Sequence, residues 1–193
     1  MWIYTYPDPA PPAATGSVVT IGNFDGVHLG HQAVLATART QADMLGVPLV
    51  ALTFEPHPRA VLRPEEAPVR LTHFARKAEL LGTYGADGVY VIDFTKDYAR
   101  TSPQDFITET LIGALKVKCV VVGNDFSFGR DRSAGLALLR ELAPRYGYTV
   151  EEVPPFIVNG DVCSSSRIRS LLAEGKTSPA EALLGHQSLD FTA

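Results

Sequence analysis

The sequence of 193 residues has only two cysteines, Cys119 and Cys163, and few positive charges. Two cysteines do not suggest a disulfide framework, and they fit a reducing compartment. Seventeen lysines and arginines against 21 aspartates and glutamates give a net charge of −4, which argues against broad binding to nucleic acid. No apolar run approaches the roughly 18 residues of a membrane-spanning helix, and no signal-peptide pattern is present. These absences predict a soluble cytoplasmic protein that binds neither membranes nor nucleic acid.

The length and the apolar fraction of 46% allow one domain with a full core that needs no disulfides. Residues 7–14 are too rich in proline for regular structure. We therefore expect residues 1–16 to form an extended lead-in, residues 17–187 to form the domain, and residues 188–193 to form a tail.

Apolar segments that favour strands alternate with segments of helical periodicity. The expected strands are 18–21, 48–54, 88–93, 117–122 and 149–153. The expected helices are 32–45, 72–84, 103–115, 134–146, 167–174 and 179–184, with Thr72 and Ser102 as N-caps. Apolar strands separated by helices indicate βαβ units. The predicted fold class is α/β, a Rossmann-like doubly wound parallel sheet of about five strands with C-terminal helices. Residues 56–71 are expected to form a small inserted loop or flap, and residues 156–162 a short hairpin.

The segment from Gly22 to His31 follows the first expected strand and opens the first expected helix. Free N–H groups and the helix dipole make such an N-terminus attractive to anions. Gly30 lets the backbone approach a ligand, and His28 and His31 can donate hydrogen bonds to phosphate. A single histidine in a turn more commonly caps a helix, but two of them around Gly30 favour a phosphate site. Asp25 is more simply explained as a turn residue.

Three further segments, 53–59, 123–129 and 164–169, also follow expected strands or open a helix. Ligands of open α/β sheets bind beyond the carboxyl ends of the strands, so these segments are expected to converge there. Serines and arginines at a second helix N-terminus suggest a ligand with several phosphates, such as a nucleoside triphosphate. The alternatives are that the serines form an ordinary N-cap, that Arg167 lies on a solvated face, and that His57 only fixes its loop. Phe126 and Phe128 alternate, so one of them is expected in the core.

Several other chemistries do not fit. Residues 175–177 resemble the end of a P-loop, but Ser170 stands where its first glycine is required. Two histidines without a cysteine pair or an acidic ligand make a poor zinc site. The Gly-x-Ser-x-Gly elbow of α/β-hydrolases is absent.

Together these motifs resemble the FMN adenylyltransferase module of prokaryotic bifunctional riboflavin kinase/FAD synthetases. The resemblance runs from about residue 18 to about residue 185 and rests on segments 22–31, 53–59, 70–72, 123–129 and 164–169. His-x-Gly-His alone marks only the nucleotidyltransferase superfamily, whereas its combination with Thr-Phe-Glu-Pro-His-Pro, Asn-Asp-Phe-x-Phe-Gly and Ser-Ser-Ser-Arg-Ile-Arg is much narrower. Ser166 stands where the family commonly has threonine, a change that keeps the hydroxyl.

The resemblance implies that AMP is transferred from ATP, with Mg²⁺, to FMN, giving FAD and pyrophosphate. It implies catalytic roles for His28, His31, Asn124 and Arg169. It implies ATP or phosphate binding by Gly22, Asn23, Phe24, Gly30, Ser164, Ser165, Ser166 and Arg167. It implies flavin binding by Phe54, Pro56, His57, Pro58, Phe126 and Phe128. The metal ligands and the oligomeric state are not assigned.

The resemblance also bears on kinase activity and on the mode of attack, and it leaves two alternative functions open. The chain stops about where a riboflavin kinase domain would begin, so kinase activity is not expected. Because the FMN phosphate is largely dianionic at neutral pH, direct attack needs neither a general base nor a covalent intermediate. The alternatives are a nucleotidyltransferase for another small phosphate, such as phosphopantetheine or glycerol phosphate, and a non-catalytic flavin- or nucleotide-binding protein.

Overall fold

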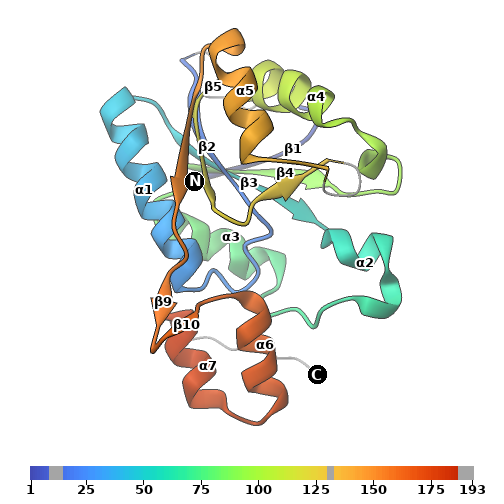
Figure 1. Ribbon diagram of the computed structural model, residues 1–193, viewed down its shortest axis with the longest axis vertical. Coiled ribbons are helices and arrows are strands. Elements are labelled where there is room, and N and C mark those ends of the chain that lie inside the picture. Colours follow the sequence, from blue (N-terminus) through green and yellow to red (C-terminus); the bar gives the residue numbers. More distant parts are fainter. Residues whose placement is uncertain (9–14, 130–132, 187–193) are drawn as a thin grey trace.

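The computed structural model describes residues 1–8, 15–129 and 133–186, and a six-stranded sheet forms its centre (Figure 1). The strand order is β1-β4-β3-β2-β5-β8, and every neighbouring pair is parallel. The strands are β1 (Trp2–Thr5), β2 (Ser17–Ile21), β3 (Leu49–Glu55), β4 (Gly88–Asp93), β5 (Val117–Gly123) and β8 (Thr149–Val153). The five expected strands and the parallel α/β class are confirmed.

The sixth strand, β1, was not expected. It pairs with β4 at the edge of the sheet, with Trp2 opposite Gly88. The indole of Trp2 occupies the space where a side chain at position 88 would stand, so glycine is needed there. The expectation of an extended lead-in over residues 1–16 therefore does not hold for Trp2–Thr5. Residues 9–14, the main part of the proline-rich segment, lie outside the described residues.

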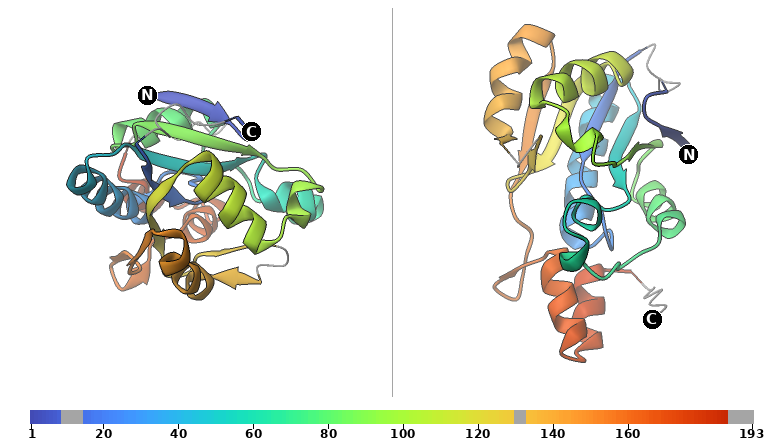
Figure 2. Two further views of the ribbon diagram at one scale, coloured as in Figure 1. Left: turned by 90° about the horizontal axis from the view of Figure 1, so that it is seen from above. Right: turned by 90° about the vertical axis from the view of Figure 1, so that its right-hand side faces the viewer.

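Helices cover both faces of the sheet, as the doubly wound prediction requires (Figure 2). α1 (Leu29–Leu45) and α3 (Phe74–Thr83) contribute to the core on one face. The other face is covered by α4 (Pro103–Asp105), the π-helix η4 (Phe106–Ala114) that continues it, and α5 (Leu136–Tyr146). A short 3-10 helix, η3 (Tyr98–Arg100), precedes α4. Among the described residues, no helix combines the length and the apolar character needed to cross a bilayer.

Two smaller units, the flap and a pair of C-terminal helices, lie beyond the carboxyl ends of the strands. The expected flap at residues 56–71 is ordered and contains α2 (Pro58–Leu62) and the 3-10 helix η2 (Pro64–Glu66). α6 (Ser165–Ala173) and α7 (Thr177–Leu184) pack on each other below the sheet (Figure 1). Leu71 and Cys163 join the apolar cluster of these two helices, so the end of the flap is attached to them.

The short strands complete the chain. β9 (Ile157–Val158) and β10 (Asp161–Val162) form the expected hairpin, and Asn159 and Gly160 both have the positive φ of a type I′ turn. β6 (Ser127–Phe128) pairs with β7 (Ala134–Gly135), so the helix expected from residue 134 begins at Leu136.

The two N-cap predictions have different outcomes. Ser102 caps α4 by accepting from the N–H of Asp105 at 3.0 Å. Thr72 is not a cap: α3 begins after His73, and the Thr72 hydroxyl accepts from the N–H of Gly26 at 3.1 Å. The prediction considered only residues next to Thr72 in sequence, whereas its hydroxyl bonds to Gly26, which is distant in sequence.

Candidate active site

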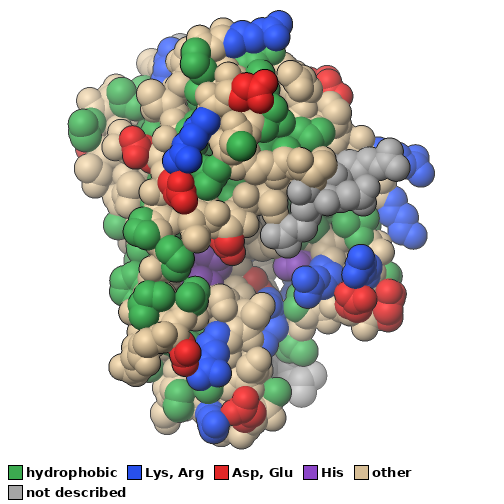
Figure 3. Space-filling view, viewed as in Figure 1, with side chains coloured by type: hydrophobic (Ala, Val, Ile, Leu, Met, Phe, Trp, Pro, Cys, Tyr) green, Lys and Arg blue, Asp and Glu red, His purple; other side chains and the backbone are tan. Residues whose placement is uncertain are grey.

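The candidate site lies where the chain reverses its direction of travel across the sheet. From β2 the chain moves to β3 and β4 on one side, and later to β5 and β8 on the other. Such a switch point leaves a crevice at the carboxyl ends of the strands. Figure 3 shows a hollow at this level, with histidine side chains at its edge.

His28 caps α1 and defines one wall of the site. Its Nδ1 accepts from the N–H of His31 at 3.4 Å. The two imidazoles stack, with ring centroids 3.7 Å apart. Because Nδ1 acts as an acceptor, a neutral His28 carries its proton on Nε2, which is therefore the available donor.

Both rings are neutral near pH 7. Burial lowers the pKa of His28 to about 4, against the opposing effect of Asp25, and Arg169 lowers it further. Burial also holds the pKa of His31 well below its usual value, reinforced by His28, Lys77 and Arg169. Nδ1 of His31 is buried and has no hydrogen-bond partner among the described residues. The pair can donate hydrogen bonds to an anion without first carrying charge.

Gly30 allows α1 to begin close to its neighbours. A Cβ at this position would lie 3.1 Å from the carbonyl oxygen of Cys163 and 3.1 Å from the His28 ring. The Sγ of Cys163 itself lies 3.7 Å from Nδ1 of His28. The absence of a side chain at Gly30 thus brings the start of α1, the His28 ring and the chain entering α6 together.

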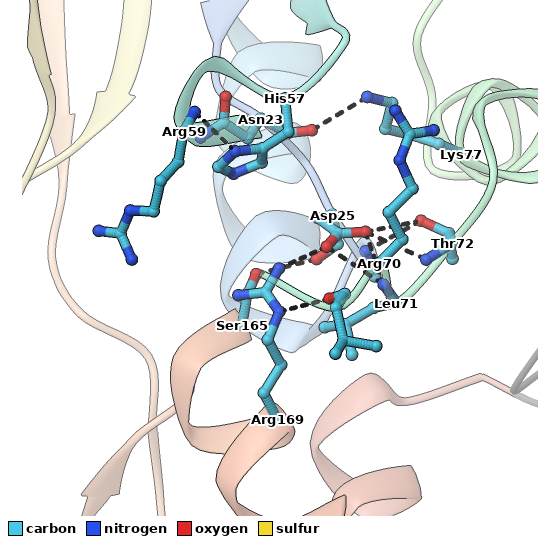
Figure 4. Close-up of polar contacts among 12 residues, drawn as sticks. Asn23, Asp25, His57, Arg59, Arg70, Leu71, Thr72, Lys77, Ser165 and Arg169 are labelled. Atoms are coloured by element: carbon cyan, nitrogen blue, oxygen red, sulfur yellow. Dashed lines mark hydrogen bonds and ion pairs between the residues drawn. The ribbon is translucent and has the colours of Figure 1, made fainter. Parts of the chain in front are cut away.

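Asp25 joins the turn at residues 22–28 to the flap and to α6 (Figure 4). Its carboxylate accepts from the N–H groups of Leu71 and Thr72, each at 3.0 Å, and pairs with Arg169. Nε of Arg169 also donates to the carbonyl of Val69 at 2.7 Å. Arg169 therefore binds protein groups through Nε and Nη2 in this structure, and its role as a phosphate ligand stays a prediction. The sequence predicted Asp25 as a turn residue but not this set of partners.

The serine cluster brings a second helix N-terminus to the same place. Ser164 caps α6 by accepting from the N–H of Arg167 at 3.2 Å, and the Ser165 hydroxyl donates to the carbonyl of Asp25 at 2.9 Å. Ser166 is exposed, and Arg167 pairs with Asp161 at 3.0 Å on the surface. The alternative of a solvated Arg167 describes its position, while Ser165 touches the 22–28 turn directly.

Part of the 22–28 turn is structural. Phe24, expected to help bind ATP, is only 1% exposed and packs its ring against Gly22. Its side chain is part of the core, so only its backbone can meet a ligand. Asn23 is exposed, and its carbonyl accepts from the Thr53 hydroxyl at 3.2 Å.

The residues expected to bind flavin lie around the ends of β3 and β5. Phe54 meets Phe94 edge to face at 5.8 Å. Phe126 stacks on Phe128 at 5.4 Å; Phe128 is buried against Phe106, as the alternation predicted for one of the pair, and Phe126 is partly exposed.

The other residues expected at the flavin side are polar residues and prolines, and none of them is buried. His57 caps α2 by accepting from the N–H of Arg59 at 3.1 Å, as a loop-fixing residue would, and Pro58 begins that helix. Pro56 and Asn124 are exposed.

Sequence reasoning missed a second polar cluster in which Lys77 and Glu55 pair at 3.1 Å. Glu55 also pairs with Arg70 at the end of the flap. The available signal was a lysine on the apolar side of α3, at helical spacing from Leu80 and Leu81.

Comparison with known proteins identifies the family. The sequence model for FAD synthetase matches residues 10–167. The chain belongs to the FAD synthetase family. It is 38% identical over 171 residues to the bifunctional riboflavin kinase/FMN adenylyltransferase of Buchnera aphidicola, covering 89% of this chain and 55% of that protein. It is 39% identical to the FAD synthetase of Listeria monocytogenes, covering 88% and 69%. The chain thus spans about half the length of most of these curated relatives, such as the Buchnera protein at 55%.

Solved structures agree with the fold. A structure described as a macrolide-efflux protein from Streptococcus pneumoniae matches with a TM-score of 0.81 and 29% identity, over 95% of this chain and 60% of that one. Pantoate–β-alanine ligase from Francisella tularensis matches with a TM-score of 0.52 and 11% identity, over 94% and 86%, and so shows a shared fold alone.

Proposed function

We propose that this chain is an FMN adenylyltransferase, which transfers AMP from ATP to FMN and releases FAD and pyrophosphate. The observation that carries the proposal is the meeting of two helix N-termini with the stacked imidazoles of His28 and His31 at the switch point. Membership of the FAD synthetase family supports it, as do the names of the curated relatives.

The reaction needs alignment and charge stabilisation rather than proton removal. An oxygen of the FMN phosphate would attack the α-phosphorus of ATP, and the bond from that phosphorus to the bridging oxygen of pyrophosphate would break. The attacking phosphate is largely dianionic at neutral pH. What the protein must supply is an in-line arrangement and donors for the charge that gathers on the departing pyrophosphate.

The chain's donors suit that task. Nε2 of His28 and the His31 ring would donate to the triphosphate beside the free N–H groups of α1. The N-terminus of α6, opened by Ser164 and Ser165, would hold further phosphate oxygens from the opposite side. Arg169 would add positive charge from its position beside Asp25.

The flavin would lie on the side of β3 and β5. Phe54 and Phe126 offer apolar surface there, and Asn124 would orient the phosphate of FMN between the aromatic side and the 22–28 turn. FMN would then approach the α-phosphorus from the side opposite the α6 terminus.

Magnesium fits this arrangement as a companion of ATP. The described residues contain no group of three or more His, Cys, Asp or Glu side chains that could hold a metal ion. Mg²⁺ keeps several waters and commonly binds through substrate phosphates with one or two carboxylates. We propose that it enters on the triphosphate, where it would neutralise charge.

The test is the formation of FAD and pyrophosphate from FMN, ATP and MgCl₂, with FAD separated by chromatography. Riboflavin replaces FMN in a parallel reaction, because it lacks the phosphate nucleophile, and the His28→Ala variant is the control for contaminating activity. FAD from FMN with stoichiometric pyrophosphate, formed far more slowly by the variant, supports the proposal. A folded protein that binds both ligands but releases no pyrophosphate contradicts it and favours a binding role. If FMN is not adenylylated but another phosphate monoester is, the flavin assignment is wrong.

A further inference from the structure

Lys77 is a buried cation that the proposed chemistry does not use. It lies on α3, and its side chain is only 6% exposed. Burial lowers the pKa of Lys77, while Glu55 raises it. Burying an ammonium group is costly unless hydrogen bonds and an opposite charge compensate for the lost water. Lys77 therefore needs partners that compensate for this cost.

The partners of Lys77 lie at two strand ends. Its Nζ donates to the carbonyl of Asn23 at 3.3 Å, to the Thr53 hydroxyl at 3.2 Å and to the Glu55 carboxylate at 3.1 Å. Asn23 belongs to the 22–28 turn after β2, whereas Thr53 and Glu55 belong to β3. One ammonium group thus ties the turn to the neighbouring strand.

The same cluster reaches the flap. Glu55 pairs with Arg70, and Leu71 and Thr72 are held next to it by Asp25. Lys77 and Arg70 lie on the same side of the site (Figure 4). The turn is therefore anchored on one side through Asp25 and on the other through Lys77.

Lys77 also acts on the site at longer range. Its charge lowers the pKa of His31 and that of His57. His28, which stacks on His31, and Arg169 on α6 lower the pKa of His31 in the same direction as Lys77 does. Lys77 is thus both a mechanical link to the turn and a source of positive potential inside the site.

We propose that Lys77 is a positioning residue of the triphosphate site, which fixes the Asn23 carbonyl to the end of β3 so that the 22–28 turn presents its donors in one orientation. This inference rests on the proposed function. A mere core-filling role for Lys77 predicts loss of stability alone. A positioning role predicts a change in nucleotide binding and in the titration of His31.

The experiment compares Lys77→Met and Lys77→Arg with Lys176→Met. Methionine matches the unbranched lysine side chain up to Cε but removes the ammonium group with its charge and its three hydrogen bonds, and arginine restores the charge. Lys176→Met makes the same chemical change at an exposed pair with Glu174, away from the site. Each protein is measured for MgATP affinity by calorimetry, for kcat and the KM of FMN, and for the pKa of His31 by NMR in the free protein.

In Lys77→Met we expect MgATP affinity and kcat each to fall about tenfold or more, because the donors of the turn are misplaced. We expect the KM of FMN to change less than about twofold, since the hydrogen bonds of Lys77 go to Asn23, Thr53 and Glu55 and not to the aromatic side chains proposed to contact the flavin. The pKa of His31 should rise once the neighbouring charge is removed. Lys77→Arg should recover most of the affinity and the low pKa, and Lys176→Met should match the wild type.

Unchanged MgATP affinity in a folded Lys77→Met protein overturns the proposal, even if its stability falls. An unchanged pKa of His31 does the same. If Lys77→Met does not fold, Lys77→Gln replaces it. Its amide removes the charge but still donates, so the pKa of His31 is then the deciding measurement, and an unchanged value overturns the proposal. The affinity and NMR measurements need no FMN. A wild type that makes no FAD therefore refutes the proposed function, while these two measurements still decide the role of Lys77.

Discussion

Replacing Asp25 by asparagine is expected to destabilise the protein and loosen the flap. The carboxylate accepts from two backbone N–H groups at 3.0 Å, those of Leu71 and Thr72, and pairs with Arg169. Asparagine keeps the shape and one acceptor oxygen but removes the charge. Arg169 is then left partly buried without its counter-ion.

The expected loss in the free energy of unfolding can be estimated from these contacts. A hydrogen bond to a charged group contributes about 1.5–3 kcal/mol, and removing one partner of a buried ion pair costs about 3–5 kcal/mol. The side chains of Asp25 and Arg169 are 11% and 20% exposed, so water screens the pair in part. One acceptor remains in Asp25→Asn. We therefore expect the free energy of unfolding to fall by about 2–4 kcal/mol, a large share of the roughly 5–15 kcal/mol typical of a domain.

The assay is urea unfolding of Asp25→Asn, Arg169→Met and the double variant. Because the two side chains are in contact, the double-mutant cycle should give a coupling energy of about 1–3 kcal/mol. Arg167→Met is the matched control on the same helix, since it breaks an exposed pair with Asp161 and should change stability by less than about 1 kcal/mol. A coupling energy near zero, or a Asp25→Asn protein as stable as the wild type, refutes the view that Asp25 holds these elements together.

Three further predictions concern the start of α1. His28→Ala or His31→Ala should lower kcat about 10²–10³-fold with little change in FMN affinity by fluorescence quenching, because each ring donates to charge formed during transfer; normal kcat in either variant removes that residue from the mechanism. The pKa of His28 falls from 6.5 to about 4 on folding, so the unfolded chain binds more protons between these values, and stability should decrease as the pH falls through this window. Urea unfolding across this range should show a slope of up to about 1.4 kcal/mol per pH unit from His28, smaller in His28→Asn; an equal slope in the variant contradicts the assignment. Gly30→Ala should lower kcat, because its Cβ would lie 3.1 Å from both the Cys163 carbonyl and the His28 ring; unchanged kcat would show that the ring tolerates displacement.

The regular elements could be predicted because each carries its own periodic signal. Four of the five longer strands are apolar along most of their length, and the helices have apolar faces. β8, at the edge of the sheet, is the exception, because Glu151 and Glu152 are exposed in it. β1 is different, with four residues in which partly buried and exposed positions alternate. Its aromatic and β-branched composition was a usable strand signal, but the prolines that follow it suggested an irregular segment.

The candidate site could be predicted only where it is local in sequence. The cap formed by His28 and the approach allowed by Gly30 both lie within one short motif. The pairing of Arg169 with Asp25 spans 144 residues, and that of Lys77 with Glu55 spans 22. Sequence shows that such charges exist but not which ones meet, because the fold decides that. These pairings were therefore seen only in the structure.

The two cysteines give the protein a natural pair of chemical reporters. Cys163 is 4% exposed and lies between His28 and the carbonyl of Leu183, so a thiol reagent reaches it only when α6 and α7 separate from α1. Cys119 is fully buried in β5, so it reacts only when the sheet itself opens. Their labelling rates under native conditions therefore distinguish partial opening of the crevice at the switch point from global unfolding, without any substitution or attached dye.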